Sequence, residues 1–266
     1  MTQPIRVCVA GVTGSVGRAL VSAIGRASDV RLVAGVARSG VGDVIAGAGS
    51  DGARIHGTVA EALSVPTDVL IDFTAPEAAK TNVLAALRRR VHAVIGTSGL
   101  TDEDYAEIDR VARESGVGAL AAGNFSISAV LLLHFATMAA RYMPSWEVID
   151  FAKAEKPDAP SGTARELAFR LGSIREPDVS VPINETAGLA EARGATLGRT
   201  QIHSIRLPGY VIGAEVFFGG AGERLSLRAE AGASAEPYVE GALLGVRKVR
   251  NLVGLVRGLD RVLGLQ

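Results

Sequence analysis

The stretch from Lys156 to Ala164 (KPDAPSGTA) combines a charged side chain with an expected helix start. Two prolines stiffen the approach, and Ser161 is placed to cap a helix that follows it directly. The first turn of a helix has free backbone N–H groups, which favour an anion. With a lysine beside it, such a turn can bind a carboxylate. The stretch therefore predicts a binding site for a small anionic substrate.

A second motif has the spacing G-x-x-G-x-x-G at Gly11, Gly14 and Gly17. It follows a short apolar run, residues 6–10, and leads into helical periodicity over 19–24. Glycines let backbone approach a pyrophosphate, and the helix start supplies N–H groups. The motif predicts a dinucleotide site, although a tight strand-to-helix turn would give the same pattern. The expected contacts are Gly11, Thr13, Gly14, Ser15, Val16 and Gly17.

The end of the second expected strand, residues 31–36, favours one dinucleotide over the other. An NAD site usually has Asp or Glu there to bind the ribose 2′-OH. This chain has Ala37, Arg38 and Ser39 instead. Arginine binds a phosphate with two parallel hydrogen bonds, so Arg38 indicates NADPH in preference to NADH. The alternative is an arginine that is merely exposed at the end of a strand.

Three further strand ends carry polar or aromatic residues. Taken singly, each is a turn or a helix cap, but the carboxyl ends of parallel strands lie at one edge, where ligands bind. We therefore add these residues to the expected cofactor site: Phe73, Thr74, Gly96, Thr97, Ser98, Asn124 and Phe125.

The arrangement of expected elements indicates an α/β protein with two domains. Strands and helices alternate in the first half, which is typical of a Rossmann-type doubly wound parallel sheet. Residues 1–127 and 236–266 are assigned to this dinucleotide-binding domain. Residues 128–235 are assigned to an α+β substrate-binding and oligomerisation domain with a mixed, largely antiparallel sheet. One face of that sheet needs cover, from its own helices or from another subunit. The second domain is expected to contain a helix over 129–143 and strands over 145–151, 200–206, 215–218 and 224–229. A final helix is expected over 235–263, where the chain returns to the first domain.

Composition limits the function further. Lys plus Arg and Asp plus Glu both number 28, which gives no support for nucleic-acid binding. The single cysteine, Cys8, lies in an apolar strand pattern, so a disulfide framework is excluded and a core thiol is expected. We expect no metal, no membrane segment and a cytoplasmic location.

In these motifs the chain resembles the dihydrodipicolinate (4-hydroxy-tetrahydrodipicolinate) reductase family of the lysine and diaminopimelate route, over essentially its whole length. The segment D-A-P-S-G-T-A at 158–164 carries most of the resemblance. The resemblance implies a homotetramer assembled through the second-domain sheets. It also implies that the 96–99 turn and residues 124–126 lie near the nicotinamide. Further, it implies that Ser161, Gly162 and Thr163 hold a substrate carboxylate, and that Lys156 is a proton donor or carboxylate partner.

The chain departs from the family signature E-x-H-H-x-x-K just before this lysine. Ala152 stands at the first histidine, which is the family's general acid, and Lys153 stands at the second. Two nearby ammonium groups lower each other's pKa, so Lys156 or Lys153 is a candidate acid. The alternative is that both bind carboxylates, or that Lys153 faces solvent. His203 is better explained as a solvated strand residue than as a replacement acid.

Three functions remain open at this point. The first is an NAD(P)H-dependent reductase of a C=N or conjugated cyclic imine, with a substrate that differs from the family's. The second is the family's own reaction, with Lys156 and water replacing the missing acid. The third is a non-catalytic NADPH-binding protein, which would have no need of the lysine and the carboxylate cradle.

Overall fold

The computed structural model describes residues 3–47 and 52–265 of the chain. The chain divides into two compact units. The first combines Met1–Ser126 with Ser234–Gln266, and the second is Ile127–Ala233. Each unit has its own sheet. Within the described ranges, no helix is both long enough and apolar enough to cross a membrane.

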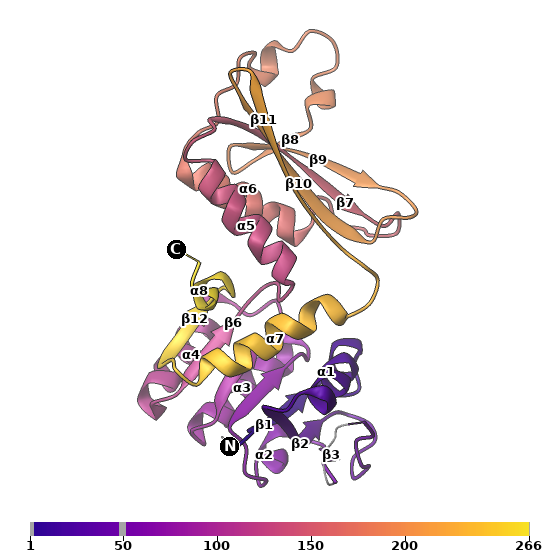
Figure 1. The fold of residues 1–266 in the computed structure, drawn as a ribbon, viewed down its shortest axis with the longest axis vertical. Coiled ribbons are helices and arrows are strands. Elements are labelled where there is room, and N and C mark those ends of the chain that lie inside the picture. The colour runs from indigo at the N-terminus through magenta and orange to yellow at the C-terminus, as the bar shows by residue number, and fades with distance from the viewer. Residues whose placement is uncertain (1–2, 48–51, 266) are drawn as a thin grey trace. The chain divides into compact units, whose positions relative to one another are not determined.

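The first unit is built on a seven-stranded sheet in the order β12-β6-β5-β4-β1-β2-β3 (Figure 1). Every neighbouring pair in it is parallel. Strand β1 is buried almost throughout, as expected of a strand with helices over both faces. The strands are β1 (Ile5–Ala10), β2 (Val30–Val36), β3 (Arg54–His56), β4 (Val69–Asp72), β5 (His92–Ile95), β6 (Gly118–Ala121) and β12 (Gly254–Arg257).

Helices cover both faces of this sheet, which confirms the doubly wound fold. Helices α1 (Ser15–Arg26) and α7 (Glu236–Val249) pack against each other, whereas α3 (Pro76–Arg88) packs against α4 (Asp102–Ser115) and the short α2 (Val59–Ala62). Sequence signals explain two of the helix starts. Thr101 and Asp104 form a reciprocal capping box at α4, and Pro76 occupies the first turn of α3.

The expected helix over 235–263 is wrong in its second half. Helix α7 ends at Val249, and β12 then pairs in parallel with β6 at the edge of the sheet, before a short α8 (Asp260–Leu263). Gly254 and Gly258 adopt positive φ angles of 87° and 102°, which a helix does not accommodate. The hydrogen bonds that β12 gains from β6 are tertiary, so helical periodicity gave no sign of them.

The second unit has a five-stranded mixed sheet in the order β11-β10-β7-β9-β8. Only β7 and β9 are parallel, which confirms the largely antiparallel sheet expected from the alternating patterns. A long connection after α6 contains two 3-10 turns, Ile183–Glu185 and Ala190–Arg193. The remaining elements are α5 (Ile127–Ala139), β7 (Ser145–Ala152), α6 (Gly162–Ile174), β8 (Ala195–Leu197), β9 (Thr200–Arg206), β10 (Ile212–Gly220) and β11 (Glu223–Ala231).

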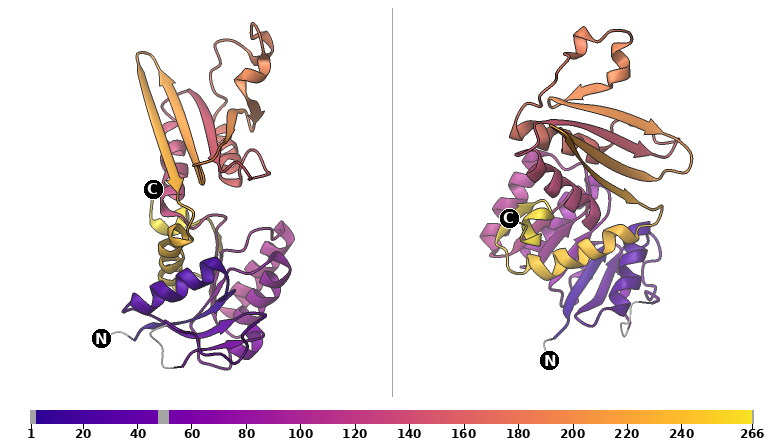
Figure 2. Two further views of the ribbon diagram at one scale, coloured as in Figure 1. Left: turned by 90° about the vertical axis from the view of Figure 1, so that its right-hand side faces the viewer. Right: turned by 45° about the horizontal axis from the view of Figure 1, so that its top comes forward.

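Alternation along the strands separates the two faces of this sheet. Helices α5 and α6 lie against one face (Figures 1 and 2). Val148 and Val216, both fully buried, belong to the core between that face and the two helices. Their strand neighbours Glu147, Ile149 and Phe217 point to the other face. Among the described residues no α-helix packs on that other face, although the long connection after α6 reaches it where Arg193 pairs with Glu147. The α-helices of the same domain therefore cover one face only.

Candidate functional site

The glycine turn between β1 and α1 brings three chain segments close together. Gly11 has φ +84°, and a Cβ there would lie 2.2 Å from the carbonyl oxygen of Phe73. A Cβ on Gly17 would lie 2.1 Å from the carbonyl oxygen of Gly11. Gly14 caps α1 without a side chain. The backbone N–H groups of the first helical turn therefore open toward the β4 strand end, as a pyrophosphate site requires.

Two adjoining hollows follow the carboxyl edge of the first sheet, with volumes of about 530 and 290 Å³. Gly14, Phe73 and Thr74 line both. Arg38 is exposed in the larger hollow and forms no ion pair with any described residue. Most of the cofactor contacts expected from the sequence line these hollows: Gly11, Thr13, Gly14, Ser15, Val16, Gly17, Arg38, Phe73, Thr74, Gly96, Thr97 and Ser98.

Asn124 and Phe125 lie outside the lining of these hollows. Phe125 is fully buried and meets Phe73 edge to face, with ring centroids 5.6 Å apart. The side-chain oxygen of Asn124 accepts a hydrogen bond from the backbone N–H of Ser126 at 2.8 Å. Phe125 therefore packs against Phe73, which lines the hollows, and Asn124 stabilises the turn that follows β6.

Asp72, the last residue of β4, holds the edge together, and sequence reasoning missed it. Its carboxylate is fully buried. One oxygen accepts from the hydroxyls of Thr74 and Thr97 at 2.8 and 2.7 Å, and the other accepts from the Asn82 amide at 2.9 Å. Buried carboxylates need such donors because desolvation is costly. Asp72 therefore fixes the turns after β4 and β5 relative to each other. The available signal was an aspartate that ends an otherwise apolar strand.

In the second unit, the residues expected to contact substrate lie between β7 and α6. Ser161 caps α6, and its hydroxyl accepts from the Ala164 N–H at 3.3 Å, so Gly162 and Thr163 form the first helical turn. The ammonium of Lys156 pairs with the carboxylate of Asp158. This hydrogen bond lowers the pKa of the Asp158 carboxyl below its usual value. Lysine and helix start are thus held in one short loop.

The positions that replace the family's histidines differ in burial. Ala152 is fully buried at the end of β7, opposite Arg206 on β9. Lys153 is exposed, and its backbone N–H donates to the carbonyl of Val211 at 3.2 Å. A backbone hydrogen bond of 3.1 Å from Lys156 to Lys153 closes a turn between the two lysines.

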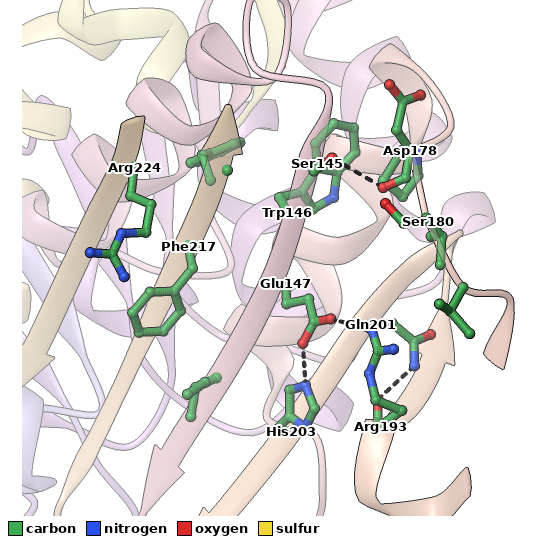
Figure 3. Close-up of a pocket in the computed structure, with 16 residues that line it drawn as sticks. Ser145, Trp146, Glu147, Asp178, Ser180, Arg193, Gln201, His203, Phe217 and Arg224 are labelled. Carbon is green, nitrogen blue, oxygen red and sulfur yellow. Dashed lines mark hydrogen bonds and ion pairs between the residues drawn. The ribbon is translucent and has the colours of Figure 1, made fainter. Parts of the chain in front are cut away.

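His203 lies on the sheet face away from α5 and α6 (Figure 3). Its ring nitrogen is 2.8 Å from a carboxylate oxygen of Glu147, which also pairs with Arg193 at 2.7 Å. Burial alone would raise the pKa of Glu147, but the hydrogen bonds from His203 and Arg193 outweigh it and lower that pKa. These residues line a hollow of about 700 Å³ that includes none of the predicted site residues. His203 is thus engaged away from the lysine loop.

The fold and the glycine turn define a Rossmann-type, dinucleotide-dependent oxidoreductase with a separate mixed-sheet domain. Residues 5–125 match the family model for the dihydrodipicolinate reductase N-terminus, and residues 128–263 match that for its C-terminus. The chain therefore belongs to the dihydrodipicolinate reductase family and is an NAD(P)H-dependent oxidoreductase.

Individual relatives agree with this assignment. The 4-hydroxy-tetrahydrodipicolinate reductase of Lactobacillus acidophilus is 38% identical to this chain, over 99% of this chain and 100% of its own length. That of Geobacillus kaustophilus is also 38% identical, over 97% of this chain and 99% of its own length. A dipicolinate-bound dihydrodipicolinate reductase from Paenisporosarcina sp. TG-14 is 30% identical, with a TM-score of 0.88 over 97% of this chain and 99% of that one. An amine dehydrogenase from Mycobacterium smegmatis, 16% identical with a TM-score of 0.67, shares the fold.

Proposed function

We propose that this enzyme reduces the C=N bond of a cyclic imine that carries a carboxylate. The observation that carries the proposal is the loop that holds Lys156 beside the open first turn of α6. Bound NADPH would supply the hydride for the imine carbon. The chain's own groups would orient the substrate: Ser161, Gly162 and Thr163 at the start of α6 would bind its carboxylate, with the backbone N–H groups of Gly162 and Thr163 as donors, because the N–H of Ser161 already donates to Asp150.

NADPH is the proposed cofactor in preference to NADH. The glycine positions fit a dinucleotide because any Cβ at Gly11 or Gly17 would occupy space taken by backbone. Arg38 is exposed in the larger hollow and could bind a ribose 2′-phosphate, and the residues beside it, Ala37 and Ser39, carry no charge to repel that phosphate. Residues 1–127 and 236–266 would then bind the cofactor, and residues 128–235 the substrate. A buried, unpaired Cys8 fits a reducing compartment, so we place the enzyme in the cytoplasm.

Lys156 is the proposed contact for the reacting end of the substrate. With Ala152 at the family's acid position, no imidazole is available in this loop. Lys156 can donate a proton to the imine nitrogen or bind a carboxylate, and its ion pair with Asp158 holds the side chain in place. Lys153, which is exposed one turn earlier, is the second candidate for the same roles.

Two substrates are candidates for this site. The full-length similarity to reductases of 4-hydroxy-tetrahydrodipicolinate favours that compound. Ala152 and Lys153 favour a different cyclic imine, because they remove the family's acid while the carboxylate cradle remains. NADPH oxidation should be followed with 4-hydroxy-tetrahydrodipicolinate and with simple cyclic imines, each with and without a carboxylate. Fast turnover of the first supports the family reaction, whereas turnover of the others alone supports a changed substrate. Tight NADPH binding without any turnover would contradict both.

We also propose a homotetramer built through the second-unit sheets. The helix-free face of that sheet leaves Phe217 39% exposed, and the long connection leaves Val179, Val181 and Leu189 44%, 50% and 77% exposed. Apolar side chains on one face that no helix covers are suited to a subunit contact. The hollow in Figure 3 lies on the same face. Native mass spectrometry should give four chains, and Phe217→Asp should dissociate them. A monomeric parent protein would contradict the assembly.

A further inference from the structure

Asp150, the third residue from the end of β7, has a fully buried carboxylate on the face of the sheet that packs against the helices. One oxygen of Asp150 accepts three hydrogen bonds: from the Arg206 guanidinium at 2.7 Å, the Ser161 backbone N–H at 2.9 Å and the Ser204 hydroxyl at 3.2 Å. Taking a carboxylate and a guanidinium out of water is costly, and only good geometry offsets the cost. Asp150 therefore joins β9 to the start of α6.

Arg206 extends this connection to the lysine loop. The same nitrogen that binds Asp150 donates to the carbonyl of Asp158 at 2.7 Å, and the other terminal nitrogen donates to the carbonyl of Ile205 at 2.9 Å. The side chain of Arg206 is only 15% exposed. Its terminal nitrogens face protein acceptors, so Arg206 is not arranged to bind substrate directly.

The contacts converge on the two groups that the proposed reaction needs. Asp158 is held through its carbonyl by Arg206, and its carboxylate holds the Lys156 ammonium. Ser161 is held through its N–H by Asp150, and its hydroxyl caps α6. Lysine and helix start are therefore both fixed to one buried ion pair.

The pair is not optimised for stability alone. Within the described chain, two of its buried atoms, one Asp150 carboxylate oxygen and the Arg206 Nε, have no hydrogen-bond partner. Such atoms are costly, and a buried ion pair is weak evidence of stabilisation. Arg206 lies directly opposite Ala152 in register, at the position where the family has its acid. The contacts of the pair instead constrain the loop between β7 and α6.

We infer that Asp150 and Arg206 are positioning residues that set the place of Lys156 relative to the first turn of α6. This inference rests on the proposed function, because it concerns how that site engages a carboxylated imine. A small displacement of a reacting group costs about 100-fold in rate, so the loop must be held as closely as the substrate.

The test uses Arg206→Gln and the isosteric Asp150→Asn in the full-length protein. In each variant we expect kcat/KM for the imine substrate to fall about 100-fold, because kcat falls and KM rises. The Kd for NADPH should be unchanged. Arg170→Gln, which breaks the Arg170–Glu166 pair on α6, is the matched control and should change neither parameter. If kcat fell only in proportion to the fraction of protein that is folded, and KM stayed unchanged, the inference would be overturned.

Hydrogen exchange provides a readout that does not depend on turnover. Backbone amides over 156–164 should exchange at least about tenfold faster in both variants than in the parent, and not in Arg170→Gln. If the parent reduces no imine, the proposed function fails, but the exchange result still decides whether the pair holds the loop. Unchanged exchange over 156–164 refutes the positioning role. Should Arg206→Gln not fold, Asp150→Asn alone decides by the same criteria.

Discussion

Replacing Gly17 with alanine tests whether the glycine turn is built by close approach rather than by flexibility. Gly17 is helical, where Gly→Ala normally stabilises by about 0.5–1 kcal/mol. Its added Cβ, however, would lie 2.1 Å from the Gly11 carbonyl oxygen and 2.8 Å from the Val12 Cα, both of them backbone atoms. Overpacking of this kind costs roughly 1–3 kcal/mol. The difference between the two effects is about 0–2.5 kcal/mol, so we expect Gly17→Ala to destabilise the protein, in contrast to an ordinary helical Gly→Ala change.

The same displacement should weaken NADPH binding, because α1 must move away from Gly11 to relieve the contact. Urea unfolding measures the stability, and NADPH fluorescence measures the Kd. Gly25→Ala provides the control, since Gly25 is an exposed residue of the same helix and its replacement should stabilise or be neutral. If Gly17→Ala matched Gly25→Ala in stability and in NADPH affinity, the close-approach argument would be wrong.

Three further changes test other parts of the site and the core. Arg38→Ala should raise the KM for NADPH by the equivalent of roughly 1–3 kcal/mol and leave the KM for NADH unchanged; equal effects would sink the 2′-phosphate assignment. Lys156→Ala should lower kcat about 100-fold with the NADPH Kd unaltered, and unaltered turnover would remove Lys156 from the mechanism. Burial, and then the charge of Asp72, raises the pKa of Cys8 from 9.0 to about 12. The native thiol should therefore resist a thiolate-specific reagent at pH 8. Because the unfolded thiol ionises first, the free energy of unfolding should fall as the pH rises above 9.0, and Cys8→Ala should remove that fall.

The parts of the fold that the sequence predicted are those with local signals. An apolar run before the glycine turn, a capping box at Thr101 and alternating residues along β9 each indicate their element without tertiary information. The strand β12 has no such signal, because its hydrogen bonds come from β6 more than a hundred residues earlier. Likewise β10 begins at Ile212 and not at residue 215. Gly213 interrupts the alternation of side chains, so the sequence gives no strand signal there, but the backbone still pairs with β7 and β11.

The site divides in the same way. The residues proposed to contact a ligand follow strand ends or helix starts, where motif spacing can predict them. The residues that hold those turns in place come from elsewhere in the chain: Thr97 reaches Asp72 across 25 positions, and Arg206 reaches Asp150 across 56. Only sheet register brings these pairs together. An aspartate at the end of a buried strand is the one sequence signal that both places share.

Each unit thus has a fully buried aspartate near the carboxyl end of a strand, which accepts hydrogen bonds from the turns around it. Orientation of this kind is worth about 7–11 kcal/mol in favourable cases, whereas a general acid contributes about 10²–10⁴-fold. A protonated imine accepts hydride without a further acid; for such a substrate Lys156 would act as the carboxylate contact, and alanine at position 152 would cost little. The alkaline limb of kcat/KM, where the imine loses its proton, should then shift with the pKa of the imine across a substrate series. A limb fixed near about pH 6.5 for every substrate would instead require an enzyme imidazole and refute this view.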